Sequence, residues 1–347
     1  MNNNPAQSSV LNSQFWLITG GCGFLGTSLI KRLLHDGVTR IRVLDNLSVG
    51  TREDLATVCT FVEIEEMRFP TQQSSPETQD STVVELVIGD IRDSETCTQC
   101  SKDVDIIVHF AANTGVPVSV EHPRLDMECN VNGTFNMLEA ARQNQVKRFV
   151  FASSGAPAGE VDPPIHEELP AHPVSPYGAS KLAGEGYCSA YFRSFNIETV
   201  ALRFGNVYGP ASGHKTSIVA KFVRQAIAGE PLEIYGDGSQ TRDFIYVDDL
   251  IESVILAGTK PGIGGEVFQI ASNRETTVGE ITEQLIAILE SEGQKNIKVI
   301  HSATRLGDVK RNFSDTTKAR TRLGWIPNVS REDGLKKTIQ WFLQTQG

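Results

Sequence analysis

A tyrosine and a lysine four residues apart are the first residues of this chain that could carry out chemistry. Tyr177 and Lys181 belong to the segment YGASK, which follows Pro176, a residue favoured in the first turn of a helix. This spacing places the phenol and the ammonium on one helix face. A phenol with a pKa of ~10 is a poor base at neutral pH, but a neighbouring cation stabilises the phenolate. The pair predicts a proton-transfer group, and the structural alternative is a tyrosine packed under a lysine stem.

A pair of serines precedes this helix and extends the candidate acid–base set. The apolar segment 148–152 is typical of a strand, and Ser153 and Ser154 follow at its end. A hydroxyl at this position can hydrogen-bond to a substrate oxygen beside the tyrosine. Turn formation is the structural alternative, because serine is common in turns.

The N-terminal part of the chain carries a glycine pattern that predicts a phosphate site. Residues 15–26 read FWLITGGCGFLG, with Gly20, Gly23 and Gly26 between an apolar strand and an amphipathic helix. In such a loop the first glycine permits the turn, the second lets the backbone approach a pyrophosphate, and the third lets helix and strand pack closely. Phe24 and Leu25, at the start of the helix, are also expected to contact the cofactor.

An acidic residue at the end of the next strand indicates which cofactor binds. Asp45 ends the segment 40–45, and a carboxylate there accepts both ribose hydroxyls of NAD and repels the 2′-phosphate of NADP. The alternative is a cap of the turn before Asn46. The sequence therefore predicts NAD. Asn46 is also expected to bind the cofactor. Further expected contacts at later strand ends are Asp90 and Ile91 near the adenine, and Ala111, Ala112 and Asn113 along the dinucleotide groove.

The elements that position these residues alternate between strands and helices. Apolar runs at 15–19, 40–44, 85–88, 105–110, 148–152 and 198–204 are separated by amphipathic stretches such as 25–35, 125–142 and 176–195. This alternation predicts an α/β fold with a doubly wound parallel sheet. We expect a disordered N-terminus (1–13), a dinucleotide-binding domain (14–204, with part of 239–271 returning to it), and a smaller substrate domain, mainly 205–347. The polar segment within 56–81 is expected to be a surface excursion.

Composition excludes several classes of protein. Apolar residues make up 39% and charged residues 21% of the 347, which is typical of folded globular proteins. The net charge of −10 argues against a nucleic-acid-binding surface. The sequence lacks a long apolar run and a signal-peptide pattern, so we expect a cytoplasmic protein without membrane contact. Cys97 and Cys100 form a CxxC without a second ligand pair, so we expect buried thiols and no metal site.

In this order, the motifs resemble those of the extended short-chain dehydrogenases/reductases, specifically the NAD-dependent nucleotide-sugar epimerase/dehydratase group. The similar stretches are LITGGCGFLG, VLDNLSVGTREDL, GDIRD, HFAA, NVNGTFNMLEAAR, FASS, SPYGASKLAGE, RFGNVYGP, GDGSQTRDFIYVDDL and RLGDVKRNFSDTTKARTRLGW. The resemblance implies a Rossmann-type fold and a catalytic triad of Ser154, Tyr177 and Lys181, with Lys181 also holding the nicotinamide ribose. It implies that Asn206, Arg242, Arg305 and Asp308 bind the diphosphate and uridine ribose of the substrate, with solvated surface charges as the alternative for each arginine.

The resemblance also limits which of the group's reactions we expect. The group's 4,6-dehydratases and uronate decarboxylases have an acidic residue just after the strand-end serine or threonine, whereas residues 155–159 contain none and the first carboxylate is Glu160. This favours NAD-dependent C4 epimerisation of a UDP-sugar through a transient 4-keto sugar. The alternatives are an NAD(P)-dependent 4-ketosugar reductase or other nucleotide-sugar oxidoreductase, and a non-catalytic NAD-binding protein.

Three positions bear on the sugar. Asn312, four residues after Asp308, corresponds to the position near the sugar C2 substituent and is small enough to admit an N-acetyl group. His214 and Lys215 could reach a C6 carboxylate, although both could equally be ordinary loop residues. We therefore expect a UDP-N-acetylhexosamine, a UDP-uronate, or both.

Two helices indicate the oligomeric state. The expected helices 125–142 and 176–195 are apolar on more than one face. The corresponding helices of the resembling family form a dimer interface, which implies a homodimer.

Overall fold

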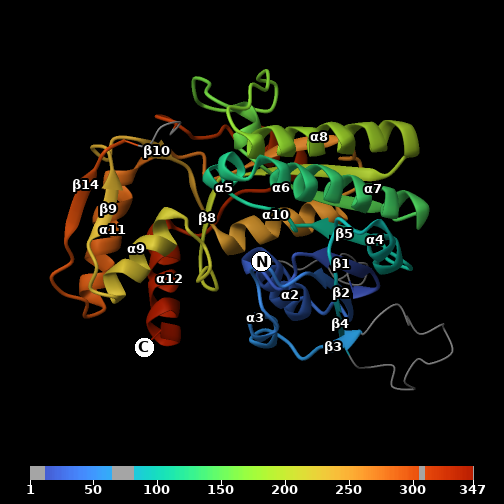
Figure 1. The fold of residues 1–347 in the computed structure, drawn as a ribbon, viewed down its shortest axis with the longest axis horizontal. Helices are drawn as coiled ribbons and strands as arrows, with labels where there is room; N and C mark the ends of the chain where they lie inside the picture. Colours follow the sequence, from blue (N-terminus) through green and yellow to red (C-terminus); the bar gives the residue numbers. More distant parts are fainter. Residues whose placement is uncertain (1–11, 65–81, 305–308, 347) are drawn as a thin grey trace.

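The computed structural model describes residues 12–64, 82–304 and 309–346. A sheet of eight parallel strands forms its larger part (Figure 1). Its spatial order is β12 (Glu266–Ile270), β7 (Glu198–Phe204), β6 (Arg148–Ser154), β5 (Ile106–His109), β1 (Phe15–Thr19), β2 (Arg40–Asp45), β4 (Val83–Ile88) and β3 (Val62–Ile64). The strand order reverses between β1 and β5, and ligands of open parallel sheets bind beyond the carboxyl ends of the strands at such a point.

Helices cover both faces of this sheet. Helices α4 (Ser94–Cys100), α7 (Gly133–Gln143) and α8 (Pro176–Phe195) lie on one face, and α2 (Phe24–His35) and α10 (Val247–Thr259) lie on the other. Most residues of the central strands β1, β2, β6 and β7 are buried, as in sheets covered on both sides. The doubly wound, Rossmann-type fold predicted from the sequence is confirmed.

A smaller lobe, on the left in Figure 1, contains the rest of the C-terminal half. Its elements are β8 (Asn206–Tyr208), α9 (Ile218–Ile227), β9 (Leu232–Tyr235), β10 (Thr241–Arg242), β11 (Phe244–Tyr246), β13 (Thr276–Thr277), α11 (Val278–Ser291), β14 (Val299–Ser302), the π-helical turn η3 (Ala319–Leu323) and α12 (Arg331–Gln346). One apolar core runs from the α2/α10 face of the sheet into this lobe. The expected division into a domain 14–204 and a domain mainly of 205–347 stays a prediction.

Two segments differ from the sequence-based expectation. Residues 62–64 lie within the expected surface excursion, yet they form the edge strand β3, which is hard to recognise because Val62 and Glu63 are both exposed. The expected helix 125–142 is interrupted: after α5 (Val116–Glu121), α6 (Pro123–Met127) leads into the π-helical turn η1 (Glu128–Asn132) before α7 begins. Most of the rest of 56–81, residues 1–11 of the expected disordered N-terminus, and Arg305 and Asp308 lie outside the described residues.

Among the described residues, no helix is both long and apolar enough to span a membrane. Cys97 and Cys100 are both buried, and burial raises the pKa of the Cys100 thiol to about 12.

Candidate active site

The glycine loop between β1 and α2 has the geometry of a phosphate cradle. Gly20 has a φ of +69°, and a Cβ there would lie 2.9 Å from the backbone nitrogen of Ala111. A Cβ on Gly26 would lie 2.4 Å from the carbonyl oxygen of Gly20, so helix and strand can approach only with glycine. A Cβ on Gly23 would meet a single neighbouring atom, at 3.3 Å. The loop therefore leaves space beside Gly23 at the start of α2, where a pyrophosphate fits.

Asp45 lies beside this loop and already makes backbone hydrogen bonds. One carboxylate oxygen accepts the Cys22 N–H at 2.9 Å, and the other accepts the Leu47 N–H at 2.8 Å. Burial raises the pKa of Asp45, while these two donors act in the opposite direction. The carboxylate thus fixes both the glycine loop and the following turn. Each oxygen keeps a second lone pair for a ribose hydroxyl, and this role stays a prediction.

The other expected cofactor residues lie along the same edge of the sheet. The Asp90 carboxylate accepts hydrogen bonds from Arg92 and Asn46, and the arginine lowers the pKa of Asp90 to about 2. Ile91 is buried and contacts Gly133 at the start of α7. Ala111 and Ala112 follow β5, where the Ala111 N–H donates to Thr19 Oγ1 at 3.2 Å. The backbone of Asn113 pairs with the Asn130 side chain.

Ser154, Tyr177 and Lys181 come together above the end of β6. Ser154 is the last residue of β6, and Tyr177 lies in the first turn of α8, where the Gly178 N–H donates to the capping hydroxyl of Ser175 at 3.1 Å. The Lys181 ammonium donates to the Ala152 carbonyl at 2.8 Å and lies 5.9 Å from the centre of the Tyr177 ring. The predicted juxtaposition of hydroxyl, phenol and ammonium is therefore present.

Burial has the largest effect on the pKa values of Tyr177 and Lys181. It raises the pKa of Tyr177 to about 12, and a side-chain hydrogen bond with Ser154 acts in the opposite direction. Burial also lowers the pKa of Lys181 to about 8. The sequence argument expected the lysine to stabilise the phenolate, but in the protein alone desolvation of the phenol is the larger effect.

A buried carboxylate near this group was not recognised in the sequence. Asp126 on α6 is 1% exposed, and its negative charge raises the pKa of both Tyr177 and Lys181. One carboxylate oxygen accepts the Asn130 side-chain N–H at 2.9 Å, and the other has no hydrogen-bond partner among the described residues. Asp126 lies in the expected amphipathic helix 125–142, where a charged residue is usually exposed, so periodicity gives no signal for its burial.

A buried ion pair joins α8 to β7 and also contacts the end of β6. Glu185 on α8 accepts two hydrogen bonds from the Arg203 guanidinium of β7, both at 2.8 Å. The Ser153 hydroxyl donates to the same carboxylate at 2.5 Å. Both residues belong to motifs noted above, KLAGE and RFGNVYGP, but only the fold shows that they meet.

A separate cavity of about 200 Å³ in the smaller lobe brings together two of the predicted substrate residues. Asn206 and Arg242 both line it, and Arg242 is held by the carbonyl oxygens of Thr241 and Val309. Asn312 lies next to β10, where its backbone N–H donates to Thr241 Oγ1 at 3.3 Å. It does not line the cavity.

The loop after β8 joins the two lobes. His214 lies 3.1 Å from the Asp54 carboxylate of α3 (Arg52–Ala56), and the Lys215 ammonium lies 5.4 Å from the centre of the Phe24 ring at the start of α2. Burial lowers the pKa of Lys215. His214 is therefore engaged by the larger lobe, while Lys215 lies beside the expected cofactor loop without an ion-pair partner in the described part of the chain.

Residues 155–159, directly after Ser154, contain no acidic side chain. Residues Ala156–Ala158 form a short 3₁₀ turn, and Glu160 beyond it is exposed.

Comparison with known proteins places this site in a family. The model of the NAD-dependent epimerase/dehydratase family matches residues 16–271. The UDP-glucose 4-epimerase of Mycolicibacterium smegmatis is 35% identical over 94% of this chain and 97% of its own length. A Thermotoga maritima UDP-glucose 4-epimerase structure with UDP-glucose (TM-score 0.83, 32% identity) matches 96% of this chain and 99% of its own. The Streptomyces venezuelae dTDP-glucose 4,6-dehydratase, solved with NAD, has a TM-score of 0.81 at 32% identity, with coverages of 96% and 98%.

The protein has the Rossmann-type fold and the glycine loop of an NAD-binding enzyme. More specifically, the chain belongs to the NAD-dependent epimerase/dehydratase family, whose members act on nucleotide sugars. Its cofactor is NAD, as the glycine loop and Asp45 predicted.

Proposed function

We propose that this protein catalyses the C4 epimerisation of a UDP-sugar, either a UDP-N-acetylhexosamine, a UDP-uronate or both. The observation that carries the proposal is the turn after Ser154, which contains no acid beside the acid–base candidate Tyr177. An elimination across C5 and C6 needs a further acid–base group, whereas oxidation and reduction at C4 need only one.

Tyr177, Ser154 and Lys181 have different roles in the proposed reaction. NAD, when bound at the glycine loop and Asp45, would supply reversible hydride transfer at C4 of the sugar. Tyr177 accepts the proton of the C4 hydroxyl and later gives it back, so that no proton is consumed. Ser154 donates a hydrogen bond to the same oxygen, and Lys181 holds the nicotinamide ribose and favours the phenolate. Because desolvation raises the pKa of Tyr177, the positive nicotinamide ring supplies part of the compensation.

The cavity of the smaller lobe is proposed to hold the UDP part of the substrate. Arg242 offers a guanidinium for the diphosphate, and Asn206 lines the same space. Arg305 and Asp308 complete this set in the proposal, and Asn312 leaves room for an N-acetyl group.

Proton NMR tests the function directly. The protein is incubated without reductant with UDP-glucose, UDP-N-acetylglucosamine, UDP-glucuronate and UDP-N-acetylglucosaminuronate in separate samples, and the coupling between H3 and H4 is followed. Conversion to the galacto form is expected for an acetylated or uronate substrate. A keto product would contradict the argument from the missing acid, while inactivity with all four would favour the reductase or the non-catalytic alternative.

Asp126 provides a pH-dependent test of the role of Tyr177. Its charge raises the pKa of Tyr177, and the phenolate is the form that accepts the proton, so activity rises with pH in the wild type. We expect Asp126→Asn to lower this pKa and to move the ascending limb of kcat/KM about one pH unit toward acid. Glu128→Gln, one residue after α6, is the control. A profile that keeps its position in Asp126→Asn would show that Asp126 is only structural.

Lys215 provides a test of the acidic sugar. We expect Lys215→Met to raise KM for UDP-glucuronate about tenfold more than KM for UDP-glucose, because a desolvated ammonium loses its anionic partner. The exposed Lys336→Met is the matched control. If both KM values rise equally and NAD binds more weakly, the ammonium faces the pyrophosphate of NAD instead, and the uronate assignment loses this support.

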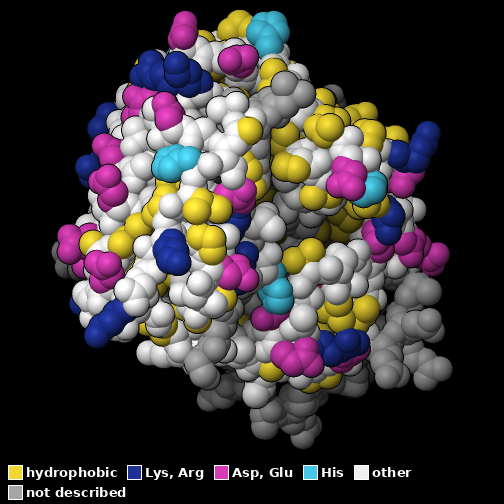
Figure 2. All heavy atoms as spheres, turned by 60° about the vertical axis from the view of Figure 1, so that its left-hand side comes forward, with side chains coloured by type: hydrophobic (Ala, Val, Ile, Leu, Met, Phe, Trp, Pro, Cys, Tyr) yellow, Lys and Arg dark blue, Asp and Glu magenta, His cyan; other side chains and the backbone are white. Residues whose placement is uncertain are grey.

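The homodimer is part of the proposal. Large apolar side chains are exposed on α5, α6, η1–α7 and α8, and hydrophobic side chains gather in the upper right part of Figure 2, over these helices. The exposed residues are Val116, Val118, Val120, Leu125, Met127, Phe135, Tyr187 and Phe195. A second copy that covers this surface would remove it from water.

Sedimentation equilibrium checks the dimer. We expect a mass of two 37.9 kDa chains for the wild type and of one chain for Phe135→Asp, because a carboxylate would be buried in the interface. Ile326→Asp, at an exposed position outside this surface, should remain dimeric. A wild-type mass of one chain would contradict the proposal.

A further inference from the structure

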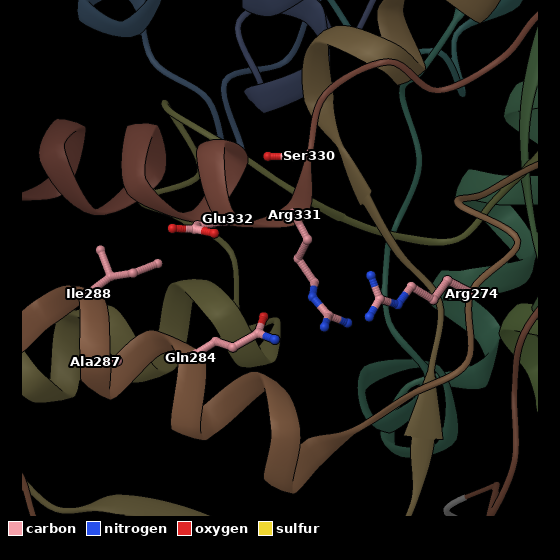
Figure 3. Close-up of a pocket in the computed structure, with 7 residues that line it drawn as sticks. All are labelled: Arg274, Gln284, Ala287, Ile288, Ser330, Arg331 and Glu332. Carbon is pink, nitrogen blue, oxygen red and sulfur yellow. The ribbon is translucent and has the colours of Figure 1, made fainter.

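A second cavity of the smaller lobe has no place in the proposed reaction. It lies between α11 and the first turn of α12 and has a volume of about 370 Å³ (Figure 3). Arg274, in the loop before β13, Gln284 of α11 and Arg331 of α12 contribute to its wall. It shares no lining residue with the cavity that contains Asn206 and Arg242.

Two cations converge in this cavity. Figure 3 shows the guanidinium groups of Arg274 and Arg331 pointing toward one another, with the side-chain amide of Gln284 directed toward the same space. The Glu332 carboxylate also lines the cavity but lies apart from the two guanidinium groups, beside α12. Neither arginine forms an ion pair within the described ranges, and Arg331 uses only Nη1 in its hydrogen bond to Thr276 Oγ1 at 2.5 Å.

The arrangement is electrostatically unfavourable without an anion. Burial and the charge of Arg274 both lower the pKa of Arg331, and Glu280 compensates only in part. Arg274 is exposed and Arg331 is half-buried, so both guanidinium groups are open to an incoming anion while the charge of one acts unfavourably on the other. A tetrahedral anion between them would accept several charge-assisted hydrogen bonds and would remove the repulsion.

We propose that this cavity binds a phosphate or diphosphate group of a small molecule. The planar, forked guanidinium matches phosphate oxygens in pairs, and the Gln284 amide adds a neutral donor. The volume lies in the range of small-molecule sites, so it can also accept part of the molecule that carries the phosphate. The site is independent of the proposed epimerisation.

The position of Arg331 connects this cavity to the substrate cavity. Its partner Thr276 lies directly opposite Arg242 in the antiparallel pair of β10 and β13. An anion that changes the orientation of Arg331 would therefore act on Thr276, the strand neighbour of Arg242, which is expected to bind the substrate diphosphate.

Titration calorimetry with inorganic pyrophosphate tests the site without any turnover. The titration uses NAD-saturated Arg242→Gln, in which the glycine loop is occupied and the substrate cavity has lost its arginine, so that remaining binding reports the second cavity. We expect saturable binding of one pyrophosphate per chain. Adding Arg274→Gln and Arg331→Gln should weaken it by at least about tenfold, because each guanidinium supplies charge-assisted hydrogen bonds.

Adding Arg193→Gln instead, at an exposed position on α8, is the matched control and should leave the affinity unchanged. Equal affinity with and without Arg274 and Arg331, or no saturable binding at millimolar pyrophosphate, would overturn the proposal. Circular dichroism of each variant establishes that loss of binding is not loss of fold. Because no sugar is present, failure of this test leaves the epimerase assignment unaffected, and failure of the NMR test leaves this one unaffected.

Discussion

Tyr177→Phe is expected to lower kcat by about 10²–10⁴ while the protein stays folded and binds NAD. The ring that packs at the start of α8 is retained, and only the hydroxyl that exchanges the proton with the sugar is removed. Lys181 cannot replace it, because its ammonium is held by the Ala152 carbonyl and carries no lone pair for a proton while charged. The measurement is the initial rate of epimerisation by NMR together with NAD affinity by fluorescence.

Tyr187→Phe is the matched control, since it removes a phenol from the same helix at an exposed position. Its rate should equal that of the wild type. Turnover of Tyr177→Phe near the wild-type level would exclude Tyr177 as the acid–base group and would reopen the assignment of the whole site. Loss of NAD binding in this variant would instead indicate a defect of the cofactor site.

Local sequence was enough to predict the elements that carry the site. The helix at 176–195 and the strand at 198–204 coincide with α8 and β7, because their apolar spacing and the Pro176 start signal are strong. The glycine loop could also be placed, since Gly23 and Gly26 approach Gly20 within the same strand–turn–helix unit, whereas the approach of Gly20 to Ala111 depends on the fold. The positions of Ser154 and Tyr177 followed from strand-end and helix-start signals.

Contacts between distant segments could not be predicted from local pattern. The Asn130 side chain bonds to the backbone of Asn113, 17 residues earlier, and it lies within the π-helical turn that interrupts the expected helix. Asp126, four residues earlier, is buried, accepts a hydrogen bond from the same Asn130 side chain and raises the pKa of Lys181. No periodicity in the sequence encodes this, because the partner backbone has no side-chain signature.

The ion pair of Glu185 and Arg203 also joins distant segments, so local sequence did not predict it. Its burial is the basis of the second prediction. Charged residues on a helix and a strand are usually solvated, yet here both side chains are about 5% exposed. Breaking a buried pair leaves one charge without a partner, which costs about 3–5 kcal/mol. We expect Glu185→Ala to lower the free energy of unfolding by about this amount, as measured by urea denaturation followed by circular dichroism.

The loss should also reach the active site, because the Ser153 hydroxyl donates to the same carboxylate and Ser154 is the next residue. We therefore expect kcat of Glu185→Ala to fall even at temperatures where the variant is fully folded. The control is Glu63→Ala, which breaks the exposed pair with Arg52 at the sheet edge and should change neither stability nor kcat measurably. If Glu185→Ala were as stable as Glu63→Ala, Arg203 would have to reach solvent or another acceptor, and the pair would not be what fixes α8 against β6 and β7.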